Sequence, residues 1–406
     1  MSMADQTASK PSFRLSMLIY DTRYRSMTIQ AIALILFMLA VAWLLSNAAS
    51  NLAALGKPLS FSFLSQPAGY DINQTLIEYN NQMSHGRAAL VGILNTLLVA
   101  FLGCVLATIL GVTIGVLRLS NNWIVSRLMT IYIETFRNVP VLLWILLTMA
   151  VLIESLPKIA LFRGENPINT MSFGNSVAFT NAGTFIPKPI FLSGSTPVVV
   201  IFFLSLVGIW AFGRWAHKRQ DETGVVLPTF SIKLAIFFLP SIAAFYILGQ
   251  PITLEYPVMA RFRFEGGYVI RNSLIALWLA LSFYTAAFIA EAVRAGIQAV
   301  SHGQTEAAAA LGIRPRRTMQ LIVLPQALRV IIPPMISQYL NLTKNSSLAI
   351  AVGYMDITGT LGGITLNQTG REMESLVILM ACYLSISITV SLFMNWYNES
   401  IKMKER

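Results

Sequence analysis

The sequence predicts an all-α, polytopic membrane protein with about eight transmembrane helices. Two bulk properties indicate this class: 55% of the 406 residues are hydrophobic and only 12% are charged, against about 25% charged in an average soluble domain. The third observation is a set of apolar runs about 20 residues long, the length that crosses a bilayer as a helix. The expected spans are 27–46, 88–116, 128–154, 196–212, 234–250, 272–293, 332–351 and 374–396.

The first span follows a polar, mildly basic segment at the start of the chain. A cleaved signal peptide would have a shorter apolar core and a small-residue cleavage site close behind it. We therefore expect the apolar run 27–46 to be retained as a helix. Together with the long loop that follows, it defines an N-terminal unit, 1–87, made of a cytoplasmic segment, a helix and a periplasmic loop.

The second and third spans form the first part of a predicted core, 88–155. Small residues let helices approach closely in membrane bundles, and three glycines of the second span are expected to do so: Gly103, Gly111 and Gly115. The weaker fourth and fifth spans lie in an inserted region, 156–271. Its outer loops contain apolar residues such as Phe185 and Ile190, so we expect them to be structured or interfacial.

The second part of the predicted core is 272–396, which contains the last three spans. The sixth and seventh spans are joined by a connection, 297–330, and the seventh span is interrupted by Lys344. A short tail, 397–406, ends the chain.

The distribution of Lys and Arg predicts the orientation of these spans, because cytoplasmic loops carry an excess of both. With the N-terminus inside, inside segments hold 18 of these residues and outside segments hold 9. Both termini and the 297–330 connection are therefore expected in the cytoplasm of a bacterium, with the chain multi-pass in the inner membrane. The same loops account for the net charge of +11, so the charge does not indicate a nucleic-acid partner.

The 297–330 connection carries the most specific pattern in the chain. It reads E-A-A, three residues, Gly, nine residues, then I-x-L-P, and its residues are Glu306, Ala307, Ala308, Gly312, Ile322, Leu324 and Pro325. Alanine is the best helix former, Ser301 and Gln304 fit a capping box, and Gly312 suits a left-handed helix end. These features predict a short helix from about 302 to 311.

This spacing resembles the cytoplasmic loop by which importer permeases of the ATP-binding-cassette (ABC) superfamily engage their ATPase subunits. Four other stretches resemble the polar amino acid permease family, the histidine/glutamine-type subunits: 95–120, 132–140, 284–296 and 344–348. The added N-terminal helix and inserted region resemble the enlarged permeases of general L-amino acid and glutamate/glutamine/aspartate/asparagine transporters.

The resemblance implies a type I ABC importer permease fold, with the Glu306–Gly312 region as the helix that docks on the ATPase. It also implies four kinds of partner beside the lipid bilayer: ABC ATPase subunits, a second and different permease subunit, a periplasmic substrate-binding protein, and an amino acid substrate. The sequence contains no G-x-x-x-x-G-K-[ST] loop, so ATP hydrolysis is expected to come from the separate subunits.

Ionisable residues within spans are costly and often functional. Two pairs have helical i, i+3 spacing and can each share one helix face: Glu134 with Arg137, and Glu291 with Arg294. A structural or gating role and direct substrate contact both remain open for them. A polar break formed by Lys344, Asn345 and Ser346 either contacts the substrate, whose carboxylate Lys344 would attract, or stabilises subunit packing.

Two other classes of function are weighed against this importer permease. A secondary transporter driven by an ion gradient is the main alternative, although such proteins usually show internal repeats, and none is clear here. A membrane enzyme or scaffold is the other. The three histidines lie apart in connections, and the two cysteines, Cys104 and Cys382, lie in apolar runs. The sequence therefore predicts no catalytic residues, no metal site and no cofactor.

Overall fold

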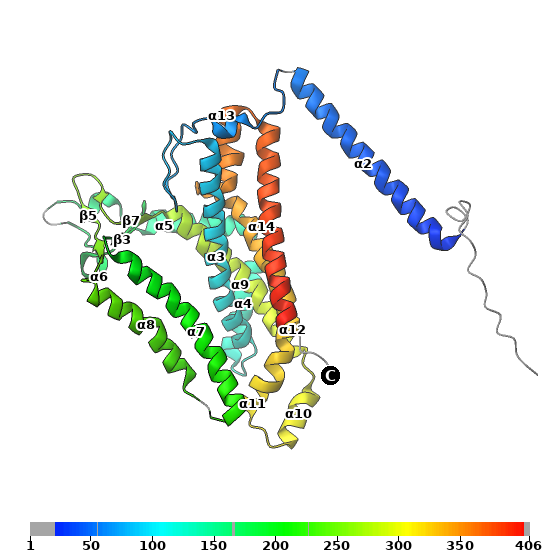
Figure 1. The fold of residues 1–406 in the computed structure, drawn as a ribbon, viewed down its shortest axis with the longest axis vertical. Coiled ribbons are helices and arrows are strands. Elements are labelled where there is room, and N and C mark those ends of the chain that lie inside the picture. Colours follow the sequence, from blue (N-terminus) through cyan, green and yellow to red (C-terminus); the bar gives the residue numbers. More distant parts are fainter. Residues whose placement is uncertain (1–20, 55, 165–166, 226, 402–406) are drawn as a thin grey trace, which may run out of the picture.

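The computed structural model describes residues 21–401 apart from 55, 165–166 and 226 (Figure 1). The first 20 residues of the expected cytoplasmic segment, and 402–406 of the expected tail, lie outside the described residues. Within the described ranges, eight helices are long and apolar enough to cross a membrane, as the sequence predicts. Secondary structure is mostly α-helical, which agrees with the predicted fold class.

Most of the expected spans are found close to their predicted positions, and several are longer; the third and the seventh differ, as described below. The long helices are α2 (Thr22–Ala54), α3 (His85–Arg118), α4 (Trp123–Asn138), α5 (Val141–Ser155), α7 (Ser195–Thr223), α8 (Thr229–Ile247), α9 (Asn272–Gln298), α12 (Leu324–Asn345) and α14 (Glu372–Ile401). Shorter helical elements are η1 (Ser62–Ser65), η2 (Ile159–Phe162), α6 (Ser172–Asn175), α10 (His302–Ala310), α11 (Pro315–Thr318) and α13 (Leu366–Thr369).

The third expected span, 128–154, is wrong as a single helix, because it is divided into α4 and α5. Val139 is extended, with φ −108° and ψ 133°, and Pro140 caps α5. The proline ring disfavours the helical conformation for the residue before it, so the helix stops there. The spanning segment at this place begins only with α5.

The seventh span is interrupted near Lys344, as predicted, and the interruption is a change of helix type. After α12 ends at Asn345, the chain continues as a 3₁₀ helix, η4 (Ser346–Val352). A π-helix, η5 (Thr358–Thr365), follows it. A second π-helix, η3 (Met319–Val323), immediately precedes α12, so α12 has irregular helix at both ends.

The bundle is centred on α9, which packs against α3, α4, α5 and α12. Its contact with α3 depends on glycine, as predicted. A Cβ atom built on Gly111 would lie 2.6 Å from the Cβ of Ile289, and one on Gly115 would lie 2.7 Å from the carbonyl oxygen of Ala290. Because both distances are too short for any larger residue, the two helices could not pack this closely with alanine at these positions.

The inserted region consists of a hairpin of α7 and α8 and, at one end of it, three small antiparallel sheets (Figure 1). The strands are β1 (Ala178–Thr180), β2 (Gly183–Ile186), β3 (Lys188–Phe191), β4 (Ile252–Glu255), β5 (Val258–Met259), β6 (Phe264–Glu265) and β7 (Tyr268–Ile270). Phe185 pairs with Val269, and Ile190 with Thr253. The outer loops are therefore structured, as expected, although the sequence analysis did not predict strands.

Candidate functional site

The predicted coupling helix is present as α10, His302–Ala310. The capping box expected at its start is wrong: the Ser301 side chain makes no capping hydrogen bond. The amide of Gln304 instead donates to the Ser301 carbonyl oxygen at 3.1 Å. The helix thus begins without help from the Ser301 hydroxyl, and its alanines supply the propensity.

The end of α10 has the geometry predicted from Gly312, whose φ is +72°. The Gly312 amide donates to the Ala309 carbonyl oxygen at 2.9 Å, and the Ile313 amide to that of Ala308 at 3.0 Å. This pair of bonds is a Schellman motif, which satisfies carbonyl groups left free at a helix end. No atom lies within 4 Å of the place where a Cβ on Gly312 would stand, so this turn faces open space.

The pattern residues of the loop divide into supporting and exposed groups. Ala308 is buried and holds α10 against the rest of the loop, near η3, which contains Ile322. Leu324 and Pro325 begin α12. Glu306, Ala307, Gly312 and Leu324 are exposed.

Sequence reasoning missed Leu311, which is 78% exposed beside Gly312. A large apolar residue between an alanine run and the cap glycine was the available signal. Leu311 is thus an apolar side chain presented at the C-terminal end of α10.

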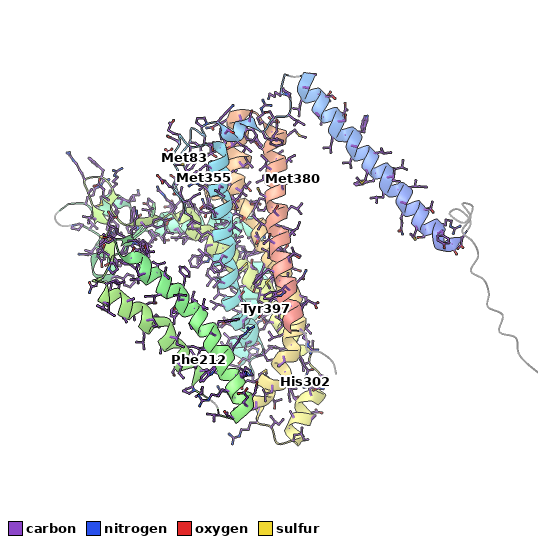
Figure 2. The ribbon with its side chains drawn as sticks, viewed as in Figure 1. Met83, Phe212, His302, Met355, Met380 and Tyr397 are labelled. Atoms are coloured by element: carbon purple, nitrogen blue, oxygen red, sulfur yellow. The ribbon has the colours of Figure 1, made fainter. Side chains whose placement is uncertain are left out.

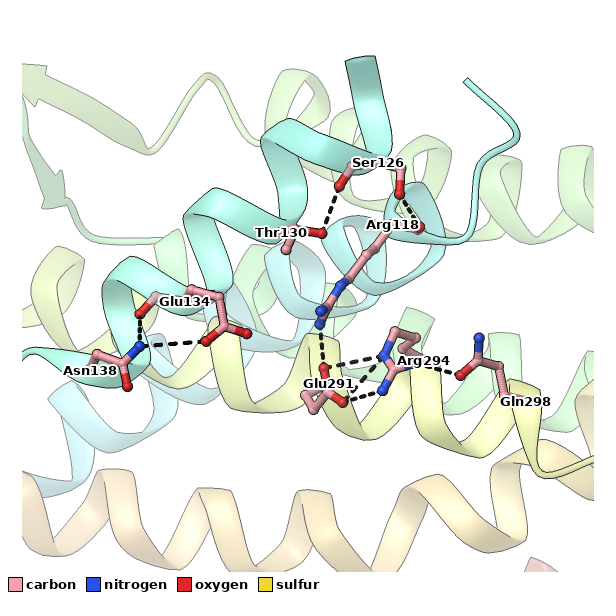
Figure 3. A network of polar contacts seen from close by, with 8 residues as sticks. All are labelled: Arg118, Ser126, Thr130, Glu134, Asn138, Glu291, Arg294 and Gln298. Carbon is pink, nitrogen blue, oxygen red and sulfur yellow. Dashed lines mark hydrogen bonds and ion pairs between the residues drawn. The ribbon is translucent and has the colours of Figure 1, made fainter. Parts of the chain in front are cut away.

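The other expected charged site is a network that joins α3 to α9 at the end nearer α10 (Figure 3). The Arg294 guanidinium donates to Glu291 Oε1 at 2.5 Å, which confirms the predicted pair. Arg118 also donates to Glu291, through Oε2, and Arg294 donates to Gln298 Oε1 at 2.5 Å. One carboxylate thus bridges two guanidinium groups, one of them from a helix 173 residues away in sequence.

The second expected pair, Glu134 with Arg137, is wrong as an ion pair. The side-chain amide of Asn138 takes the place of Arg137. It donates to the backbone carbonyl oxygen of Glu134 at 2.8 Å and to Oε2 of the Glu134 side chain at 3.4 Å. Arg137 lies over the Phe288 ring, 5.4 Å from its centroid. Both side chains are exposed, and Figure 3 shows Glu134 on α4 beside the α3–α9 network.

The three residues of the predicted polar break lie at the junction of α12 and η4, and they differ in exposure. Ser346 is fully buried and its hydroxyl donates to the Thr343 carbonyl oxygen at 2.8 Å. Asn345 is half-buried, and Lys344 is exposed. Lys344 lines a pocket of about 440 Å³ together with Ser347, Thr358, Leu379, Met380 and Tyr383.

A buried carboxyl group beside this pocket was missed by sequence reasoning. Asp356 lies between the spanning segments of α12 and α14, accepts from the Gly359 amide at 2.8 Å and accepts from the Tyr383 hydroxyl at 3.0 Å. Burial raises the pKa of the Asp356 carboxyl to about 6, and these hydrogen bonds oppose the increase. The available signal was one acidic residue within the apolar and glycine-rich stretch 348–366.

No group of three or more His, Cys, Asp and Glu side chains that could hold a metal ion occurs among the described residues.

Comparison with known proteins places these sites in a family. Residues 221–403 match the family described as "Binding-protein-dependent transport system inner membrane component". This match covers α8 to α14, which include α10, the Glu291–Arg294 pair and the polar break, whereas Arg118 of the network lies outside it. A solved structure, "Crystal structure of an amino acid ABC transporter with histidines", aligns over 78% of this chain and 95% of its own, with a TM-score of 0.45 and 19% identity.

Two relatives align over nearly the whole chain. The glutamate/glutamine/aspartate/asparagine transport system permease protein BztB of Rhodobacter capsulatus is 55% identical over 420 residues, which cover 98% of each chain. The general L-amino acid transport system permease protein AapQ of Rhizobium johnstonii is 44% identical, covering 97% of this chain and 96% of its own. The chain therefore belongs to the permease subunits of amino acid ABC importers, a family of membrane transport proteins that are not enzymes.

Proposed function

We propose that this permease forms one half of the translocation path for glutamate, glutamine, aspartate or asparagine, with a second, different permease as the other half. Separate ABC ATPase subunits would drive it, and a periplasmic binding protein would deliver the amino acid. The name of the 55% identical relative lists these four amino acids, and this supports proposing them as substrates. Family membership also favours this function over transport driven by an ion gradient.

The observation that carries the coupling proposal is the shape of α10. It ends in a Schellman turn with open space around Gly312 and with Leu311 exposed. An exposed apolar side chain on a rigid turn can enter a groove of an ATPase subunit, because burying it there gains hydrophobic free energy. Ala308 and the start of α12 would then carry the motion of the ATPase into the bundle.

Replacing Gly312 by Asp tests this coupling. We expect ATP-driven uptake to fall on the order of tenfold or more, because a charge and a strained left-handed residue would occupy the docking surface. The measurement is uptake of radiolabelled glutamate in cells, together with recovery of the ATPase subunit on the tagged permease. Leu311→Ala is expected to weaken recovery in the same direction.

Gly224→Asp is the matched control for Gly312→Asp. Gly224 also ends a helix with φ +70°, and nothing lies within 4 Å of its Cβ position. It caps α7 rather than α10, so uptake should be nearly unchanged. Normal uptake in Gly312→Asp, with normal amounts of protein in the membrane, would refute the coupling role.

A second part of the proposal concerns the substrate path. On α12, three exposed polar residues lie at i, i+4 and i+7: Ser337, Asn341 and Lys344. Residues at this spacing share one helix face, and a polar face in a membrane belongs against protein or a water-filled cavity. We assign it to the path between the two permeases, where Lys344 would attract the substrate carboxylate and Asn345 would offer a hydrogen bond.

Kinetics of two Lys344 variants distinguish substrate contact from packing. Lys344→Ala should raise the KM for uptake on the order of tenfold, since a charge-assisted hydrogen bond contributes roughly 1.5 kcal/mol or more. Lys344→Arg keeps the charge and should retain most of the affinity. If both variants have the KM of the wild type, Lys344 is outside the path.

The Glu291 network and Glu134 are assigned a gating role rather than substrate contact. They lie together on α3, α4 and α9 (Figure 3), and Glu291 is near the end of α9 from which the chain continues into α10. In the proposed orientation, with both termini in the cytoplasm, this is the inner mouth of the path. Closure of the ATPase subunits would move α10 and, through the adjacent end of α9, this mouth.

A further inference from the structure

The free end of the α7–α8 hairpin contains a pocket of about 810 Å³. Leu206 and Ile209 of α7 form an apolar part of its lining, nearer the middle of that helix. Cationic side chains from both helices form the part nearer the turn that joins α7 to α8. Arg214 belongs to α7 and Lys233 to α8. The pocket is therefore an open groove along α7 to which α8 contributes Lys233.

Lys233 is the unusual residue of this pocket. It is half-buried between the helices, and its amine reaches across to α7, where a Cβ built on Gly213 would lie 3.2 Å from Nζ. Within the described ranges, no acidic side chain lies in ion-pair range of either Lys233 or Arg214. Both cations therefore lack an acidic partner among the residues described, and an anion bound between them would supply one.

The neighbouring basic residues of α7 differ, because they already have acidic partners one turn away. Lys218 Nζ lies 3.8 Å from Glu222 Oε1, and His217 Nδ1 lies 3.5 Å from Asp221 Oδ2. Asp221 also lines the pocket, but it faces His217 on its own helix and lies outside ion-pair range of Arg214 and Lys233. The unbalanced positive charge is thus concentrated on Arg214 and Lys233.

Arg214 is held in place for contact with an anion. Its guanidinium stacks over the Trp210 ring, 4.1 Å from the centroid. This stacking orients the planar group, whose fork of N–H donors matches phosphate oxygens. Trp210 itself is exposed, and tryptophan is enriched at the membrane–water interface.

We propose that this pocket binds the phosphate of an anionic phospholipid, clamped between Arg214 and Lys233, with an acyl chain along Leu206 and Ile209. The hairpin end lies at the same end of the molecule as α10 (Figure 1), and Phe212 and His302 lie toward that end together (Figure 2). In the orientation of the proposed function this end is at the cytoplasmic surface, where basic pockets between spanning helices bind anionic headgroups.

The test is native mass spectrometry of the full-length chain in detergent, titrated with phosphatidylglycerol or phosphatidylcholine. We expect a bound phosphatidylglycerol and a loss of its affinity of roughly fivefold or more in Lys233→Gln, the effect of one cation at an anionic surface. Gly213→Leu changes no charge but displaces the amine of Lys233, so it should lose affinity as well. Lys233→Arg should keep it.

Arg219→Gln is the matched control. Arg219 is a cation of the same helix end that stacks on Trp215 and does not line the pocket. If this variant loses as much affinity as Lys233→Gln, binding is diffuse attraction to basic flanks and the proposal fails. If millimolar inorganic phosphate displaces the lipid, the site takes free phosphate and the proposal fails as well.

Orientation is measured separately, by labelling Gln220→Cys in intact cells and in inverted membranes with an impermeant maleimide. Labelling from outside would overturn the orientation on which the headgroup assignment depends. Because α10 lies at the same end of the molecule, that result would count against the coupling role as well. Labelling from inside together with unchanged lipid affinity in Lys233→Gln would refute the lipid site alone, and normal uptake in Gly312→Asp would refute the coupling role alone, so the two failures are distinguishable.

Discussion

In the bundle, 61% of the apolar window of α9 is buried within the chain, whereas the values for α7 and α8 are 11% and 6%. Both regions consist of spanning helices, but they make their contacts differently. The bundle brings backbones together through glycines such as Gly111 and Gly115. The hairpin holds its two helices together with large side chains, for example Phe202 and Phe237, whose ring centroids are 5.3 Å apart.

The two regions also differ in how far their ion-paired side chains are exposed. In the bundle, Glu291 bridges Arg118 and Arg294, with 27% of its side chain exposed. In the hairpin, the His217 and Asp221 side chains are 79% and 71% exposed. The difference teaches that partly buried ion pairs join helices within the bundle, whereas the ion pairs of the hairpin lie on its surface.

The largest expected effect comes from enlarging a bundle glycine. Gly115→Leu should destabilise the folded protein by about 3 kcal/mol or more, because the Ala290 carbonyl and the Val293 side chain occupy the space. The measurement is the yield of monodisperse protein in detergent and its Tm.

The hairpin equivalent is Gly208→Leu, where the nearest atom is Cγ2 of Ile236 at 3.2 Å. Since that side chain can rotate, the cost should be nearer 1 kcal/mol. Equal losses of Tm for Gly115→Leu and Gly208→Leu would contradict the division between the two regions.

The second prediction concerns pH. Because burial raises the pKa of Asp356 to about 6, the folded protein keeps this proton at pH values where the unfolded chain has lost it. The free energy of unfolding should therefore decrease as pH rises between about 4 and 6, by roughly 2–3 kcal/mol at most. Thermal unfolding of the wild type and Asp356→Asn across this range measures the effect, which the variant should lack.

His217→Gln serves as the hairpin control for the pH experiment. Its exposed side chain should leave the slope of Tm with pH as in the wild type. A slope that persists in Asp356→Asn and disappears in His217→Gln would assign the pH dependence to the hairpin instead.

The smallest effects are expected from removing one charge from an ion pair in each region. Glu291→Gln leaves two half-buried guanidinium groups without their carboxylate and should lower stability by about 1–2 kcal/mol. Asp221→Asn should have no measurable effect on Tm, because exposed ion pairs contribute little. If Glu291→Gln and Asp221→Asn lowered Tm equally, burial would not determine how much each ion pair contributes to stability.

Much of the fold could be predicted because bilayer thickness sets the length of each apolar run. The α10 helix and its Gly312 cap were predictable for a similar reason, since propensity and backbone conformation are local properties. The break at Pro140 could have been predicted, because a proline disfavours helix at the residue before it. The prediction of one span instead followed the continuous apolar run. The Glu291–Arg294 pair followed from helical spacing alone.

Contacts between distant segments could not be predicted in this way. Arg118 reaches Glu291 only because α3 and α9 pack side by side, and Asn138 competes locally with Arg137 for Glu134. The Asp356–Tyr383 hydrogen bond likewise depends on how the chain returns after α12. The strands of the inserted region are two to four residues long, which is too short for a periodic pattern to be visible.

The two ends of α12 deviate from α-helical winding in opposite senses. The π-helix η3 before it is under-wound, and the 3₁₀ helix η4 after it is over-wound. If both segments relaxed toward α-helix together, their changes of twist would have opposite signs. α12 would then turn about its own axis between them, and the face that carries Ser337, Asn341 and Lys344 would turn with it.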